Sequence, residues 1–369
     1  MRLGIVVPSV AVIGTRGYPS YYSGFETAVR RIAPYLVDAG WDVTVYGRPG
    51  ATRPADPLRD ARIMTRETRG LETKSASTLS YGLTACFDAA AHRPDAALVM
   101  NVANGYYLRI LKSRGIPTLV NVDGLEWERA KWGTLAKRVF RTGAALTARW
   151  ADSLVFDARA VEGYWHDTFG VDGHFIPYGG DVLPTLPVPE GLEHRGYVLM
   201  VARFVPENTI AEFFAAVPGI AARYPVVLVG SSGYGGEWDD RARALARDYA
   251  AVSWLGHLSN DALLHALWQH AGIYFHGHSV GGTNPSLVQA MAAGSPILAR
   301  DTIYTREVLG EAGLFVDADS GLITETVLGL MSDSRRLDEA AYANRLRAEQ
   351  HYSWDEVCKA YEIALRALI

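Results

Sequence analysis

The stretch IYFHGHSVGGTNPSLVQAMAAGSPILARD, residues 273–301, decides the fold of this chain. It begins with an apolar run that predicts a buried strand, and a second apolar run after Pro296 predicts the next strand. Between these runs, Asn284 and Pro285 mark the start of a helix, the first as N-cap and the second in the first helical position. The helix is expected to end at Gly294. Strand, turn, helix and strand in this order predict one unit of a parallel sheet.

The glycine turn inside this stretch predicts an anion-binding site. Unpaired N–H groups and the positive end of the helix dipole converge where a strand passes through such a turn into a helix. Glycines at such turns also serve backbone conformation alone. For Gly281 and Gly282 both interpretations remain open at this point.

The same alternation of strands and helices extends through the rest of the chain. Residues 10–13, 25–39 and 42–46 predict a strand, a helix and a strand, which is a first βαβ unit. Residues 183–196 contain three prolines and no periodicity, and they predict a linker. The further expected strands are 62–64, 96–100, 117–121, 153–156, 174–176, 197–201, 226–229, 252–255 and 314–316.

We therefore predict an α/β fold of two Rossmann-like, doubly wound domains that face each other across a cleft. The first domain is expected to span residues 1–182 and the second residues 197–352, with the linker 183–196 between them. The C-terminal helix, about 353–369, is expected to pack back on the first domain.

Composition narrows the class of protein. Of the 369 residues, 49% are hydrophobic and 21% are charged, which is typical of a soluble globular protein. The net charge of −4 argues against a nucleic-acid binder. Two distant cysteines are not a disulfide framework and fit a reducing cytoplasm, where we expect the protein. The N-terminal apolar run lacks a signal-peptide cleavage site, so a first core strand is expected there.

Several polar residues follow expected strands, where a doubly wound fold places its ligand. Arg203 lies two residues beyond strand 197–201, and its planar guanidinium suits phosphate oxygens, although a solvated surface arginine is equally consistent. Gly256 lies in a turn whose backbone groups suit a planar base. No spacing of cysteine, histidine and aspartate indicates a metal site.

Two carboxylates follow strand 117–121. We hypothesise that Asp123 orients or deprotonates an acceptor hydroxyl and that Glu126 holds the acceptor. An Asx turn and helix capping are the structural alternatives for this pair.

The turn after the first strand, Gly14-Thr15-Arg16-Gly17, does not match the dinucleotide fingerprint G-x-G-x-x-G. Its glycines are expected to let the chain approach a diphosphate or a sugar closely, with Arg16 as an anion partner. This loop is therefore expected to line the same cleft.

Four segments together resemble the family-four glycosyltransferases of the GT-B fold: GFETAVRRIAPYLVDAGWDVTVYGR, NVDGLEWERAKW, ARFVPEN and HSVGGTNPSLVQAMAAGSPILA. They are most similar to the bacterial subgroup that includes rhamnosyltransferases of capsule and cell-wall polysaccharides. The resemblance implies a retaining transfer, without metal or other cofactor, from a nucleotide-diphosphate sugar in an interdomain cleft. The expected sugar is rhamnose or a related deoxyhexose from a dTDP- or UDP-linked donor, and the acceptor is a saccharide, lipid-linked or free.

The resemblance also assigns donor-binding positions. Arg203 matches the family's diphosphate arginine, but Asn208 stands where a lysine is usual. The family's two glutamates, spaced by seven residues, correspond here to Gly281 and Gln289. Gln289 can still bond a ribose hydroxyl, but without the strength of a charged partner. The full set of expected donor-binding residues is Arg203, Asn208, Gly256, His278, Gly281, Gly282, Thr283, Asn284, Ser286 and Gln289.

Two other functions fit the same residues. One is a nucleotide-sugar 2-epimerase of the same fold, which needs no acceptor. The other is a catalytically silent partner protein, because Asn208, Gly281 and Gln289 depart from the commoner family pattern.

Residues 127–150 mix tryptophans with lysines and arginines. Such a helix suits peripheral contact with an anionic membrane surface, on the inner face of the membrane, next to a lipid-linked acceptor. A solvated helix face whose tryptophans pack into the core explains the same pattern.

Overall fold

The computed structural model describes residues 7–21, 24–72, 77–129, 132–233 and 235–369. The chain divides into two compact units, and each is an α/β layer structure around a parallel sheet, so the predicted fold class is confirmed. Unit 1 comprises Met1–Glu128, Trp132–Tyr178 and Trp354–Ile369, and unit 2 comprises Arg129–Lys131 and Gly179–Ser353.

Within the described residues, the sheet of unit 1 has seven parallel strands in the order β3-β2-β1-β4-β5-β6-β7. Val10 of β1 pairs with Val43 on one side and with Ala96 on the other, so β1 and β4 mark the point where the winding reverses. The strands are β1 Ser9–Ile13, β2 Asp42–Gly47, β3 Met64–Glu67, β4 Ala96–Met100, β5 Thr118–Asn121, β6 Ser153–Phe156 and β7 His174–Phe175.

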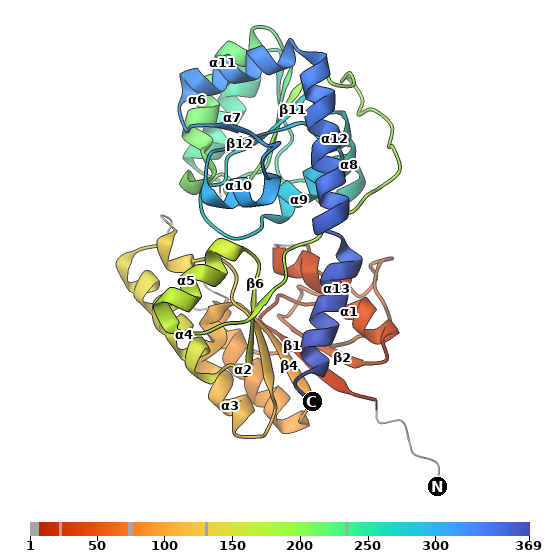
Figure 1. Ribbon diagram of the computed structural model, residues 1–369, viewed down its shortest axis with the longest axis vertical. Coiled ribbons are helices and arrows are strands. Elements are labelled where there is room, and N and C mark those ends of the chain that lie inside the picture. The colour runs from red at the N-terminus through yellow and green to blue at the C-terminus, as the bar shows by residue number, and fades with distance from the viewer. Residues whose placement is uncertain (1–6, 22–23, 73–76, 130–131, 234) are drawn as a thin grey trace. The chain divides into compact units, whose positions relative to one another are not determined.

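Helices cover both faces of this sheet. Apolar residues of α1 at helical spacing, such as Ile32 and Leu36, are fully buried against the strands. The C-terminal helix α13 lies beside α1 in Figure 1 and adds Tyr361 and Leu365 to the same core. The helices of the unit are α1 Gly24–Asp38, α2 Ser77–His92, α3 Leu108–Lys112, α4 Thr134–Trp150, α5 Arg159–Phe169 and α13 Trp354–Arg366, with short 3₁₀ turns η1 Val102–Tyr107 and η2 Glu126–Glu128.

Unit 2 repeats this architecture with six parallel strands among its described residues, in the order β10-β9-β8-β11-β12-β13. Strands β8 and β11 mark its reversal point, and Leu199 pairs there with Tyr274. The strands are β8 Val198–Val201, β9 Val226–Val229, β10 Val252–Trp254, β11 Ile273–His276, β12 Ile297–Arg300 and β13 Leu314–Val316. The helices are η3 Pro206–Asn208, α6 Ile210–Ala221, α7 Glu237–Asp248, α8 Asp261–His270, α9 Pro285–Ala292, α10 Ile303–Leu309, α11 Ser320–Met331 and α12 Ser334–His351.

The stretch predicted as a linker has no regular structure and is held on unit 2 by the end of α8. The Leu186 N–H donates to Gln269 Oε1 at 2.8 Å, and Leu186 O lies 2.8 Å from His270 Nε2. Arg195 Nη1 donates to Ala271 O at 2.8 Å. These bonds satisfy backbone groups that the prolines leave without regular partners.

Several elements differ from the prediction. The helix expected at 105–113 begins as the 3₁₀ turn η1, capped by Asn101, whose side chain accepts from the Ala103 N–H. Helix α10 was not predicted, although Thr302 and Thr305 form a reciprocal capping box at its start. The long C-terminal helical region is two helices, α12 and α13, separated at residues 352–353.

Among the residues that the structure describes, no helix combines the length and the apolar character needed to cross a membrane.

Candidate functional site

The reversal point of unit 2 brings two predicted features to one edge of the sheet. Neighbouring parallel strands β8 and β11 end at the same edge, and the loops that leave them diverge because their helices cover opposite faces. Arg203 follows β8, and the turn 277–284 follows β11. The two features therefore lie beside each other at the place where doubly wound folds bind ligands.

The turn after β11 offers backbone donors. Gly281 has a φ of +128°, a conformation that favours glycine. The N–H groups of Gly281, Gly282 and Asn284 have no acceptor within the described ranges, whereas Thr283 is 2% exposed and engaged elsewhere. Free amides next to one another form a cradle for an anion.

Helix α9 starts at the predicted residues. The way it starts decides which backbone N–H groups remain open to an anion. Asn284 Oδ1 accepts from the Ser286 N–H at 3.0 Å, Asn284 O accepts from Leu287 at 3.0 Å, and Pro285 has no N–H. The first turn of the helix is therefore satisfied internally. Donors for an anion come from the preceding turn, while the dipole of α9 still favours negative charge there.

The loop after β8 is held rigidly. Asn208 is 2% exposed, and its side-chain amide donates to Arg203 O at 2.8 Å, so this residue shapes the loop. The Arg203 side chain itself is exposed. Ser279 donates through N and Oγ to Glu207 O at 2.9 and 2.8 Å, which ties η3 to the turn after β11.

Two histidines stack at the end of β11. The rings of His276 and His278 lie 4.4 Å apart with an angle of 13° between their planes. Burial lowers the pKa of His276 to about 3. Burial, helped by the electrostatic effects of His276, Arg203 and Arg129, holds the pKa of His278 well below its usual range. Both rings are therefore neutral near pH 7 and suit hydrogen bonding to a ligand better than proton transfer.

Buried polar atoms without partners gather beside the same turn. Both carboxylate oxygens of Glu207, His276 Nε2 and His278 Nδ1 have no hydrogen-bond partner in the described part of the chain. Each such atom forfeits hydrogen bonds that it would make in water. Their concentration at one edge of unit 2 marks it as a place whose polar groups serve something other than stability.

The remaining predicted donor-binding residues lie at the same edge of the sheet. Ser286 and Gln289 lie on the first turns of α9, half-buried. Gly256 follows β10, two strands from β8, and its carbonyl accepts from the Gly230 N–H at 2.7 Å.

In unit 1 the glycines of the first turn are explained by packing. Gly14 has a φ of +97°, and a Cβ there would lie 2.2 Å from Met100 O. A Cβ on Gly17 would lie 2.7 Å from Thr52 Oγ1. These glycines therefore let the turn pack closely against other segments of the same unit. The Arg16 N–H donates to Glu26 Oε1 at 2.9 Å.

Asp123 stands at the end of β5 in a left-handed conformation, with a φ of +60°. Its N–H donates to Asn121 Oδ1 at 2.9 Å, and the Asn121 amide donates to the Tyr361 hydroxyl at 2.6 Å. This Asx-type bond keeps the half-buried Asp123 at the carboxyl edge of the sheet. Position and conformation both suit a carboxylate that meets a ligand.

Glu126 has a different environment from Asp123. It is 6% exposed, and its Oε2 accepts from the Trp132 indole at 2.8 Å. This carboxylate positions Trp132, whose ring lies 5.2 Å from that of Phe140. Its described contacts are therefore structural, and the predicted contact with an acceptor remains untested.

Sequence reasoning missed two carboxylates near Asp123. Asp157 comes directly after β6, the neighbour of β5, and is 2% exposed, while Glu26 is 3% exposed. Burial, together with the charges of Asp123, Asp157, Tyr361 and Glu26, raises the pKa of Tyr178 well above its usual value. The signal was available, because Asp157 ends a predicted apolar strand.

The mixed aromatic and basic stretch separates into two faces. Trp127 is 7% exposed and donates to the Tyr164 hydroxyl at 3.3 Å, and Trp150 lies 5.0 Å from the Arg109 guanidinium. On α4 the exposed side chains include Leu135, Arg138, Arg141 and Arg149. Trp127 is thus buried, Trp132 and Trp150 are half-buried, and arginines dominate the exposed side chains of α4; Lys131 lies outside the described residues.

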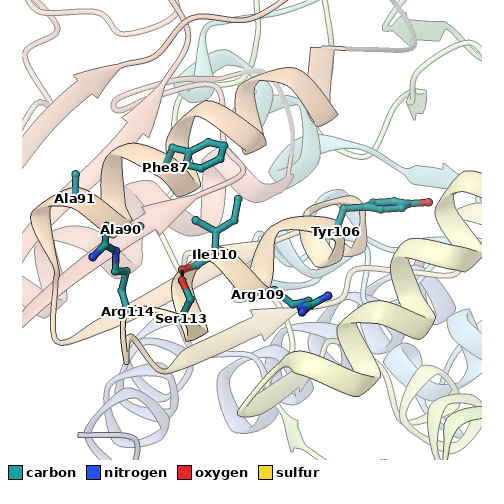
Figure 2. Close-up of a pocket in the computed structure, with 8 residues that line it drawn as sticks. All are labelled: Phe87, Ala90, Ala91, Tyr106, Arg109, Ile110, Ser113 and Arg114. Carbon is teal, nitrogen blue, oxygen red and sulfur yellow. Dashed lines mark hydrogen bonds between the residues drawn. The ribbon is translucent and has the colours of Figure 1, made fainter.

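Figure 2 shows a separate surface hollow between α2 and the helical turns of η1 and α3. It is lined by Phe87, Ala90, Ala91, Tyr106, Arg109, Ile110, Ser113 and Arg114. The ends of α2 and α3 that line it lead into the amino ends of β4 and β5. The hollow is therefore distinct from the carboxyl edge that carries Asp123.

Across the described ranges, no three or more histidine, cysteine, aspartate or glutamate side chains are grouped so as to hold a metal ion.

Comparison with known families covers both units. Residues 23–179 match the glycosyl transferase 4-like domain, and residues 195–333 match the glycosyl transferases group 1 domain. The phosphatidyl-myo-inositol mannosyltransferase of Mycolicibacterium smegmatis is 32% identical over 213 residues, which are 53% of this chain and 53% of that protein. The chain thus spans about half the length of the curated relative that it matches.

Solved structures agree over nearly the whole chain. Sucrose-phosphate synthase from Thermosynechococcus elongatus superposes with a TM-score of 0.78 at 20% identity, covering 98% of this chain and 99% of the other. Anabaena HepE, solved in complex with UDP-glucose, superposes with a TM-score of 0.76 at 13% identity, covering 97% and 99%. At these identities the likeness concerns the fold.

The packing account of Gly14 predicts a difference between two glycine substitutions. Gly14→Ala meets both an unfavourable φ and Met100 O, whereas Gly40→Ala, at a φ of +87° with nothing within 4 Å, meets only the φ. Gly40→Ala is expected to lower the free energy of unfolding by about 1 kcal/mol and Gly14→Ala by about 3 kcal/mol. Calorimetric unfolding of both variants measures this, and equal losses would refute the packing account.

Proposed function

We propose that the chain is a glycosyltransferase of the GT-B fold that transfers a sugar from a nucleotide-diphosphate donor to a saccharide acceptor, with retention of anomeric configuration; the two glycosyl transferase domain matches and the GT-B fold support this proposal. The observation that carries this proposal is the meeting of free amides, an exposed arginine and a neutral histidine at the reversal point of unit 2.

The main contacts of the proposed donor site are with the diphosphate. Free N–H groups of Gly281, Gly282 and Asn284 bind phosphate oxygens, and the guanidinium of Arg203 neutralises their charge. The same contacts strengthen as charge builds on the leaving diphosphate, so they accelerate cleavage of the sugar–oxygen bond. Neutral His278 bonds a hydroxyl of the sugar, and the half-buried Gln289 bonds the ribose.

The proposed acceptor site belongs to unit 1. Asp123 accepts a hydrogen bond from the acceptor hydroxyl and takes its proton as the new bond forms. Its φ of +60° and the bond of its N–H to Asn121 Oδ1 fix the backbone from which the carboxylate extends. No metal ion is required in this proposal, because amides and guanidinium supply the stabilisation of the leaving group.

The transferred sugar is proposed to be rhamnose or a related deoxyhexose, following the resemblance to the rhamnosyltransferase subgroup. The relative named for mannose transfer makes mannose the direct competitor. Gln289, which lacks the charge of a glutamate, fits a deoxythymidine donor whose sugar has one hydroxyl fewer than ribose.

A panel of dTDP-rhamnose, UDP-glucose and GDP-mannose tests the proposal. Formation of free nucleoside diphosphate with a saccharide product is expected for at least one donor, with dTDP-rhamnose turned over fastest. Conversion of the donor to its 2-epimer without acceptor would instead identify an epimerase. Complete lack of turnover and of donor hydrolysis would identify a silent partner protein and refute sugar transfer.

Asp123→Asn tests the assigned base. The amide keeps the size of the carboxylate but cannot accept a proton, so kcat is expected to fall about 100-fold or more with donor saturating, while the donor KM changes little. Glu128→Gln, an exposed neighbour, is the matched control. A kcat of Asp123→Asn near the wild-type value would remove Asp123 from the chemistry.

We further propose a peripheral contact with anionic membranes through α4, from the cytoplasmic side. Because the exposed charged side chains of α4 include Arg138, Arg141 and Arg149, whereas its tryptophan, Trp150, is half-buried, the contact depends on these arginines and is electrostatic. Binding to vesicles with phosphatidylserine is expected at low salt and is lost in 0.5 M salt, a condition that screens charges beyond about 4 Å. Replacing the three arginines with glutamine should abolish it; vesicle sedimentation measures binding, and equal binding to neutral vesicles would contradict the proposal.

A further inference from the structure

Arg300 places a second guanidinium at the donor edge of unit 2. It ends β12, whose neighbour β11 leads into the turn with the free amides. Its Nη1 donates to Thr209 Oγ1 at 3.1 Å, and Thr209 Oγ1 donates to Gly277 O at 2.5 Å. The guanidinium thus reaches past the end of β11 to the residue that precedes α6.

The charge of Arg300 has no carboxylate partner within 4.0 Å among the described residues, although the side chain is half-buried. Arg306 on α10, in contrast, has a carboxylate partner. Its Nε and Nη2 donate to the two oxygens of Asp301 at 2.6 and 2.5 Å. A partly desolvated cation without a counter-charge is costly, and an anionic ligand would offset that cost.

Thr209 holds this cation in place through an unusual backbone. The residue is fully buried with a φ of +57°, a left-handed conformation that a β-branched side chain rarely adopts. In this conformation its hydroxyl bridges the Arg300 guanidinium and Gly277 O. Such conformations persist where surrounding contacts enforce them, and they concentrate at functional sites.

A diphosphate carries more than one negative charge, and the loop after β8 supplies only one cation to it. Asn208 is neutral, 2% exposed and bonded to Arg203 O, so it adds no charge. The carboxylate of Glu207, buried in the same loop, opposes an anion. The Arg129 guanidinium also lies beside the turn, since its Nη2 would be 3.7 Å from a Cβ on Gly281. A further cation at the end of a neighbouring strand would add to the positive charge that faces a diphosphate.

We propose that Arg300 binds the diphosphate of the donor together with Arg203 and the turn amides, as a further cation of the site. This inference rests on the proposed function, because it assumes a nucleoside diphosphate at that edge. Arg300 is assigned here to binding of both substrate and leaving group.

Calorimetric titration with UDP, UMP, dTDP and dTMP tests the proposal on wild type, Arg300→Gln, Arg300→Lys and Arg306→Gln. Arg300→Gln is expected to weaken diphosphate binding about tenfold or more, and monophosphate binding less, because a charge-assisted contact to the second phosphate is lost. Arg300→Lys should lose part of the affinity, since it keeps the charge but not the planar fork. Arg306→Gln, whose charge is already paired, should bind like wild type.

The outcomes separate the two proposals. Diphosphate binding by wild type with an unchanged diphosphate-to-monophosphate ratio in Arg300→Gln would overturn the role of Arg300 and leave the function standing. Failure of wild type to bind any nucleoside diphosphate would overturn both. If Arg300→Gln does not fold, as judged by thermal unfolding, the ratio in Arg300→Lys decides, and an unchanged ratio there overturns the proposal.

Discussion

Backbone N–H groups at the end of β11 that have no acceptor in the described part of the chain are the feature on which the candidate site of unit 2 depends. The N–H groups stay open because Asn284 and Pro285 complete the start of α9 by themselves and Gly281 adopts a φ that other residues avoid. The reversal of winding between β8 and β11 then keeps neighbouring loops from covering the turn. Arg203 and Arg300 flank it from the ends of β8 and β12. Local capping and sheet topology together thus produce the arrangement that we propose as an anion site.

The polar groups beside this turn lower stability rather than raise it. Glu207, His276 and His278 bury atoms without partners, and Thr209 is held in a left-handed conformation. Each feature opposes folding by roughly 1–3 kcal/mol, and the apolar core around β8 and β11 must outweigh them. Preorganised sites have this character, since donors and charges fixed before the ligand arrives need no reorganisation during the reaction.

Much of the fold was predictable because the apolar runs and the residues that start or end helices indicate the same elements. The strand, cap and proline around Asn284 could be inferred directly from the sequence, and the parallel arrangement of both sheets follows from the alternation of strands with helices. The missed helix α10 is short and has a threonine capping box, which carries less signal than a long amphipathic pattern. The start of α6 was harder to predict, because its N-cap Thr209 is held by tertiary hydrogen bonds to Gly277 and Arg300.

The candidate site was predictable in position more than in detail. Arg203 and Asp123 follow strands, so their place at a carboxyl edge could be inferred. The bond of the Asn208 amide to Arg203 O, the bond of the Trp132 indole to Glu126 and the close approach of Gly14 to Met100 O are contacts that form only in the folded chain. Spacing along a chain does not encode such contacts. Arg300 was not predicted as a site residue, because its place beside the turn depends on the pairing of β12 with β11.

A crystal structure of the protein soaked with a nucleoside diphosphate tests the central claim most directly. The account predicts phosphate oxygens within hydrogen-bonding distance of the N–H groups of Gly281, Gly282 and Asn284, with the Arg203 guanidinium on the same diphosphate. A diphosphate bound away from this turn, with those N–H groups still facing solvent, would contradict it.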